Sequence, residues 1–144
     1  MQKPQKKPVY AFDKALHLLN YKNYSSFAMK KKLEQFNFTA PEIKLAIDKC
    51  KELKLLNDED TFKLYIEKAQ IEKKWGYRKI VCKLQEKQVP YDRIKFYMQE
   101  YYQRELEEEI KEVLIQEKEK TLSDTMEPLK KKGMIARFLN QRGF

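Results

Sequence analysis

One local pattern occurs three times in this chain: an apolar residue, a leucine four positions later, and an apolar residue five positions after the leucine. The copies are Met29, Leu33, Phe38; Ile80, Leu84, Val89; and Ile135, Leu139, Phe144. An apolar residue five positions after a leucine is typical of a helix that ends in a Schellman motif, because the residue two past the cap folds back onto the last turn. The pattern therefore predicts three helices that stop in the same way.

The residue just before the last apolar position of each copy is expected to be left-handed. Asn37 and Gly143 suit that conformation well, and Gln88 suits it less well. The spacing of the copies predicts a tandem helical repeat of about 50 residues, a class of fold that builds extended binding surfaces rather than closed catalytic pockets.

Composition supports an all-α fold. Glycine is scarce, with 3 in 144 residues, and charged residues make up 37% of the chain. Apolar residues follow helical spacing rather than the alternation of strands. Lys and Arg number 31 against 22 Asp and Glu, a net charge of +9, so an anionic partner is expected. The chain shows no signal peptide and no apolar run of the roughly 20 residues that a membrane span needs, which predicts a cytoplasmic protein that binds no membrane.

The pattern divides the chain into four segments. Residues 1–9, rich in Lys and Pro, are predicted to be a flexible basic tail. Residues 10–56 form a first three-helix module, in which Ser25 is the N-cap of the second helix and Thr39 with Glu42 opens the third as a capping box.

Residues 57–102 are predicted to repeat that module. The acidic turn from Asn57 to Asp60 supplies the N-cap and first-turn carboxylates of its first helix, and Gly76 takes the position of Ser25. Residues 103–144 form a third module. It starts with an acid-rich helix from Glu105 to about Lys120, continues through a stretch that Pro128 and Gly133 interrupt, and lacks its last helix.

Positive charge is concentrated at the start of the chain. Residues 1–56 carry 12 basic against 5 acidic side chains, residues 57–102 carry 10 against 8, and residues 103–144 carry 9 against 9. The two cysteines, Cys50 and Cys82, and the single His17 match no metal-ligand spacing, so no metal or cofactor is expected.

The residues also carry a family resemblance. From about Ala11 to Phe144 the chain resembles RecX, the regulatory protein of the RecA recombinase. The resemblance rests on the order and spacing of four groups: Tyr24-Ser25 followed by Lys32-Leu33; Leu56-Asn57-Asp58-Glu59 followed by Phe62, Tyr65 and Ile66; Gly76, Arg78, Ile80 and Leu84; and Phe138-Leu139 with Arg142-Gly143-Phe144. Departures are Asn37 and Gln88 where the family usually has glycine, Asp60-Thr61 before Phe62, and the missing last helix.

The resemblance implies three tandem three-helix repeats, each like a helix-turn-helix module without a wing. It further implies a monomeric regulator without a catalytic site or cofactor. Such a protein binds the RecA filament on single-stranded DNA, and typically inhibits its ATPase and strand-exchange activities in recombination, DNA repair and the SOS response.

Basic and aromatic residues are the candidate contacts with the RecA filament or with DNA. They are Lys30, Lys31, Lys32, Trp75, Tyr77, Arg78, Lys79, Lys130, Lys131, Lys132, Arg137 and Arg142. Each group has a structural alternative. The segment from Trp75 to Lys79 could be a loop whose aromatic rings cover the junction between modules, Lys30–Lys32 a solvated helix face, and Lys130–Lys132 a solvated face or a mobile turn.

The sequence argues against two other classes of function. A sequence-specific DNA-binding module would use the third helices, Glu42 to Leu53 and Asp92 to Tyr102, but these lack the cluster of Arg, Asn and Gln that reads base edges. An enzyme is disfavoured because the chain has no phosphate-binding glycine loop, no metal motif and a single histidine. A basic helical module that acts directly on nucleic acid without RecA remains the alternative.

Overall fold

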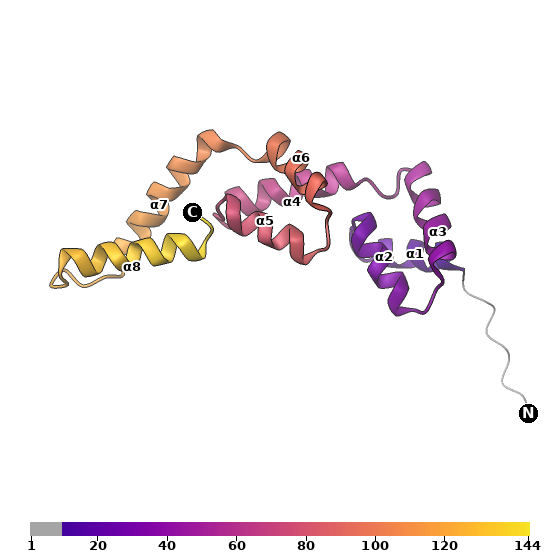
Figure 1. Ribbon diagram of the computed structural model, residues 1–144, viewed down its shortest axis with the longest axis horizontal. Coiled ribbons are helices and arrows are strands. Elements are labelled where there is room, and N and C mark those ends of the chain that lie inside the picture. Colours follow the sequence, from indigo (N-terminus) through magenta and orange to yellow (C-terminus); the bar gives the residue numbers. More distant parts are fainter. Residues whose placement is uncertain (1–9) are drawn as a thin grey trace, which may run out of the picture. The chain divides into compact units, whose positions relative to one another are not determined.

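The structure, a computed structural model, describes residues 10–144, so the predicted basic tail at residues 1–9 lies outside the described part. The described residues form eight α-helices and one 3-10 helix, and contain no strand (Figure 1). The all-α prediction is confirmed. The chain divides into two compact units, of which the first ends at Phe62 and the second begins at Lys63. The division into three modules at residues 56 and 102 stays a prediction.

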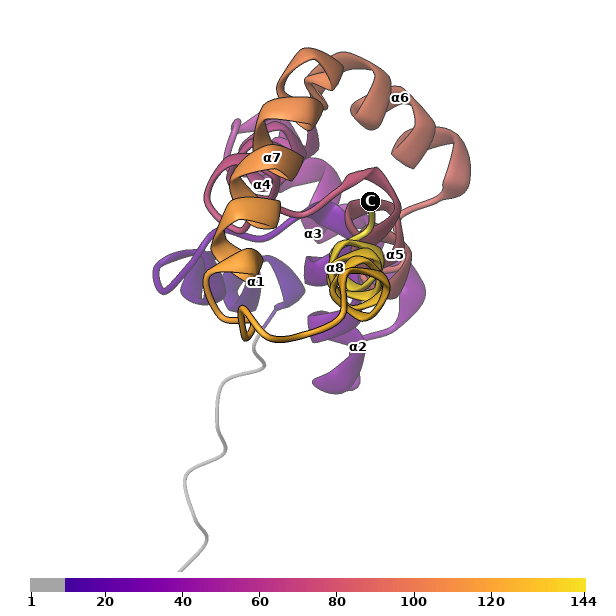
Figure 2. The same ribbon diagram turned by 90° about the vertical axis from the view of Figure 1, so that its left-hand side faces the viewer.

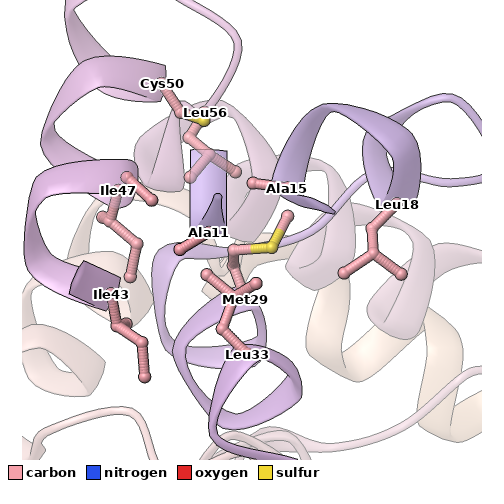
Figure 3. Packing of buried hydrophobic residues seen from close by; sticks show 10 residues of the cluster. Ala11, Ala15, Leu18, Met29, Leu33, Ile43, Ile47, Cys50 and Leu56 are labelled. Atoms are coloured by element: carbon pink, nitrogen blue, oxygen red, sulfur yellow. The ribbon is translucent and has the colours of Figure 1, made fainter. Parts of the chain in front are cut away.

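The first unit contains helices α1 (Ala11–Leu19), α2 (Ser26–Gln35) and α3 (Ala40–Glu52). Figure 3 shows side chains from all three helices gathered around Met29 and Leu33 of α2, both of which are fully buried. Leu56, which follows α3, completes this core. The helical spacing of apolar residues thus places one buried stripe from each helix against the other two.

The predicted caps of the first unit are confirmed. The Ala28 backbone N–H donates to Ser25 Oγ at 3.0 Å, and Thr39 and Glu42 form a capping box. One further cap joins residues far apart in the sequence. The Ser26 backbone N–H and the Ser26 hydroxyl both donate to the carboxylate of Asp58. Asp58 therefore stabilises the start of α2 as well as its own helix, α4 (Asp58–Ile71).

Replacing Asp58 with alanine is expected to lower the stability of the first unit by about 1 to 2 kcal/mol, because two donors at the start of α2 lose their acceptor. Urea unfolding followed by circular dichroism measures the loss, and hydrogen exchange of the Ser26 amide should become faster. Asp48→Ala, at an exposed position of α3, is the control. Equal effects of the two substitutions would contradict the cap.

The second unit contains the rest of α4 and helices α5 (Tyr77–Glu86), α6 (Tyr91–Tyr101), η1 (Arg104–Leu106), α7 (Glu107–Glu119) and α8 (Pro128–Gln141). Ile80 and Leu84 of α5 are fully buried, and Ile94 and Met98 of α6 are almost so. Gln70 of α4 is also buried, and its side-chain amide binds both the N–H and the C=O of Gln103. This pair of hydrogen bonds attaches the start of η1 to α4.

All three predicted Schellman motifs are present. The Phe38, Val89 and Phe144 N–H groups donate to the carbonyls of Leu33, Leu84 and Leu139, and the preceding residue is left-handed each time, with φ of 64° at Asn37, 63° at Gln88 and 93° at Gly143. The local pattern is therefore sufficient to end a helix even where glycine is absent.

Two expectations for the third predicted module are wrong. Pro128 and Gly133 do not interrupt the chain, because Pro128 occupies the first turn of α8, where its missing N–H costs nothing, and Gly133 lies within the same continuous helix. Lys130, Lys131 and Lys132 consequently lie on the first turns of α8 and not in a mobile turn. In α7, Leu114 is fully buried, whereas its neighbour Val113 is 42% exposed.

Candidate nucleic-acid interface

Trp75 lies at the centre of a cluster of lysines in the second unit. Its indole is half-buried, and the ammonium groups of Lys73, Lys79 and Lys83 lie 4.5, 4.9 and 5.9 Å from the ring centroid. A cation at this distance is attracted to the electron-rich face of the ring and keeps its positive charge. Three ammonium groups are therefore gathered beside one rigid side chain.

The backbone turn between α4 and α5 places this ring. Lys74 is left-handed, with φ of 54°, and directs the chain away from α4, after which the Trp75 N–H donates to the Ala69 carbonyl at 3.0 Å. Gly76 is the N-cap of α5, as predicted, but it has no capping side chain. The end of the chain supplies acceptors instead: the Gly76 and Arg78 N–H groups donate to the carbonyls of Arg142 and Gly143, at 2.6 and 3.3 Å. Figure 2 shows the C-terminus beside α5.

Arg78 and Arg142, two of the predicted contact residues, bind within this unit. The Arg78 guanidinium donates to Asn140 Oδ1 at 2.7 Å and to the Phe144 carbonyl. The Arg142 guanidinium donates to the Lys73 carbonyl at 2.9 Å and lies over the Phe138 ring. Both side chains thus help to hold the end of α8 against the start of α5, in addition to any role in partner binding.

Tyr77 also has neighbours within the unit. Its ring meets the edge of Tyr102 at a centroid distance of 5.3 Å, and the Arg104 guanidinium lies 5.1 Å from its centroid. The Tyr102 hydroxyl donates to Glu107 at 3.2 Å, and burial together with the Glu107 charge raises the pKa of Tyr102 well above its ordinary value. An open cavity of about 490 Å³ lies beside Tyr77. Its rim mixes cations and carboxylates, so it favours no single charge of ligand.

The remaining predicted contact residues lie elsewhere. Lys30 and Lys31 are exposed on α2 and Lys32 is half-buried, so the first unit carries a basic helix face of its own. Lys130, Lys132 and Arg137 are exposed on α8, where Lys131 is half-buried. Of the twelve predicted residues, the structure brings together Trp75, Tyr77, Arg78, Lys79 and Arg142.

Sequence reasoning missed Lys73, Lys83 and Lys87. Lys83 completes the cluster around Trp75, and the Lys87 ammonium lies 5.0 Å from the centroid of the Tyr65 ring. The missed signal was the four-residue spacing of Lys79, Lys83 and Lys87, which places the three on one helix face.

The cluster also has a partial counterpart in the first unit. Lys22 lies over Tyr24 at 4.8 Å, and this pair precedes Ser25 as Lys73 and Trp75 precede Gly76. The counterpart lacks the second lysine, because Ala28 takes the position of Lys79. The fuller cluster of cations is therefore specific to the second unit.

Within residues 10–144 no group of three or more His, Cys, Asp or Glu side chains is placed to hold a metal ion. Cys50 is buried, which raises the pKa of its thiol, and Cys82 is exposed. None of the helices in the described part of the chain is both long and apolar enough to cross a membrane.

Comparison with known proteins gives one family and two solved structures. Residues 11–50, which include α1, α2 and most of α3, match the family described as RecX, first three-helix domain. A crystal structure of the regulatory protein RecX is 16% identical, with a TM-score of 0.80 over 93% of this chain and 66% of its own length. The crystal structure of RecX from Lactobacillus salivarius is 20% identical, with a TM-score of 0.82 over 93% of this chain and 86% of its own. No curated protein sequence matches.

The two structural likenesses establish the fold, and the chain spans slightly less than two thirds of the first of these structures. The family match is independent of them, because it concerns the sequence of the first three helices. Residues 11–50 of this chain are therefore similar to the first three-helix domain of RecX, and the chain as a whole has the fold of the two RecX structures.

Proposed function

We propose that this protein is a regulator of the RecA recombinase. In this proposal it binds the RecA filament on single-stranded DNA and inhibits its ATPase and strand-exchange activities, as a cytoplasmic monomer without cofactor or catalytic chemistry. Recombination, DNA repair and the SOS response are the processes it would control. The observation that carries the proposal is the match of residues 11–50 to the first RecX domain.

The charge of the chain supports this partner. A nucleoprotein filament is a polyanion, and a protein of net charge +9 is attracted to it at long range. Exposed basic side chains lie on α2 and α8, and the half-buried Lys79 and Lys83 of α5 lie beside Trp75, so these three helices offer cations for phosphates or for acidic protein surface. The fold class fits the same role, since helical repeats bind other macromolecules through extended surfaces.

Adding the protein to RecA on single-stranded DNA is expected to depress ATP hydrolysis at or below one copy per RecA. The effect is expected to persist when more single-stranded DNA is supplied, because contacts with RecA make the filament a tighter target than the bare strand. A coupled ATPase assay measures both. An unchanged rate at saturating protein would refute the proposal.

The alternative function is a basic helical module that binds nucleic acid without RecA. The lysines around Trp75 favour it, because they could bind phosphates with no protein partner. The two functions differ in the same assay. A protein that only sequesters DNA would lose its inhibition as extra single-stranded DNA is added.

A further inference from the structure

A row of four lysines extends along one side of α5. We call Lys73, Lys79, Lys83 and Lys87 the lysine row. Lys79, Lys83 and the C-cap residue Lys87 are spaced by four residues, which places them on one helix face at intervals of about 6 Å. Trp75 holds three of the ammonium groups at one end of the row, and Tyr65 lies under Lys87 at the other.

Two lysines at the Trp75 end of the row, Lys73 and Lys79, have no carboxylate partner in the described part of the chain. Among residues 10–144, no carboxylate lies within 4.0 Å of the Lys73 or Lys79 ammonium group. An aromatic ring holds a cation without neutralising it, in contrast to a carboxylate. These two groups are therefore ordered by Trp75 and still available to bind an anion.

Lys83 and Lys87 differ from these two lysines, because a carboxylate lies beside them. Glu86 lies 3.4 Å from Lys83. Burial raises the pKa of Tyr65, and the Glu86 charge raises it further, so this carboxylate also lies near the ring under Lys87. Glu86 would repel a polyanion that follows the row. The end at Trp75 is the more attractive one.

We propose that the lysine row binds the phosphate backbone of single-stranded DNA and that Trp75 is a positioning residue for its lysines. Regularly spaced cations on one face match a ligand whose charges also repeat along its length, and lysine binds phosphate as a point charge. The choice of a single strand rests on the function proposed above. Arg78 and Arg142 are not part of this site, since their guanidinium groups bind Asn140 and the Lys73 carbonyl.

The proposal is tested without RecA, with fluorescein-labelled oligo(dT) and the full chain at several salt concentrations. Lys73→Gln/Lys79→Gln should make the slope of log K against log salt less negative by about 1.4, since each phosphate contact on a single strand contributes about −0.7. Lys44→Gln/Lys51→Gln, at two exposed positions of α3, removes the same charge and should leave the slope within error of the unmodified chain. Equal slopes for the two double variants would overturn the site.

Three further arms sharpen the test. Glu86→Gln should tighten binding several-fold by removing the carboxylate from the row. Trp75→Phe keeps an aromatic face and should bind almost as well as the unmodified chain, whereas Trp75→Leu keeps all four lysines and should bind as weakly as Lys73→Gln/Lys79→Gln. Circular dichroism of each variant checks that it is folded. Equal binding by the Phe and Leu variants would remove the positioning role from Trp75, and an equally strong response to duplex DNA would overturn the choice of a single strand.

Trp75 is the only tryptophan, so its emission should change when oligo(dT) binds and should not change in Lys73→Gln/Lys79→Gln. The outcome is separable from that of the RecA assay. Loss of DNA binding with normal inhibition of the ATPase would refute the lysine row alone. Normal DNA binding with no effect on RecA would refute the proposed regulator and leave the row intact.

Discussion

Replacing Gly143 with alanine is expected to destabilise the second unit by about 2 to 5 kcal/mol. Two costs add: a left-handed backbone that alanine avoids, and a steric overlap. Gly143 has φ of 93°, and a Cβ placed there would lie 2.4 Å from the Lys79 backbone nitrogen and 2.6 Å from its Cβ. Neither neighbour is the far end of a flexible side chain, so the end of α8 must move away from α5.

Gly133→Ala is a matched control within the same helix. A Cβ at Gly133 would meet no heavy atom within 4 Å, and its backbone is helical. Alanine there is expected to stabilise the unit by about 0.5 to 1 kcal/mol, because it reduces the freedom of the unfolded chain. Urea unfolding followed by the emission of Trp75 reports on this unit alone. Effects of the same sign at the two glycines would contradict the close approach of α8 to α5.

Replacing Leu84 with alanine is expected to cost about 2 to 5 kcal/mol, the range for a fully buried leucine whose neighbours cannot close the cavity. Leu84 is 0% exposed and lies between α5 and the core of the second unit. Its counterpart in the third copy of the pattern, Leu139, is only half-buried. Leu139→Ala should therefore cost about 1 kcal/mol, since part of that side chain already contacts water.

Leu129→Ala is the surface control for this pair, because Leu129 is 82% exposed at the start of α8. Its effect is expected to stay within about 0.5 kcal/mol. The same Trp75 transition measures all three variants. A cost at Leu139 equal to that at Leu84 would show that burial does not distinguish the copies of the pattern.

Helix ends were the part of the fold that could be predicted best. A Schellman motif, an N-cap or a capping box involves residues within about six positions of one another, so it can be predicted from a short stretch of sequence. Ser25, Thr39 and Glu42 behave as predicted, and so does the apolar residue after each left-handed position. Pro128 was misread because proline ends one helix and begins another equally well.

The candidate site could be predicted only in part. The sequence shows the cations and rings near Trp75, but it does not show which side chains bind within the protein. In the sequence, Arg78 and Arg142 are basic residues near aromatic ones, as the lysines are. In the structure, however, both guanidinium groups donate to acceptors in the second unit. The Asp58 cap of α2 was missed for the same reason, since Ser26 and Asp58 are 32 positions apart.

The sequence by itself determined the class of fold, the sites where helices stop, and the excess of positive charge, because these depend on local hydrogen bonds, apolar spacing and composition. Only the tertiary structure explains why two of these positions, Gly76 and Gly143, are glycine. Gly76 has an ordinary φ of −83°, and a Cβ there would lie 2.6 Å from the Gly143 carbonyl group. Asn37 and Gln88 are left-handed without being glycine, whereas Gly143 must also lie against Lys79. Steric contact between segments distant in the chain sets this requirement, and no local pattern records it.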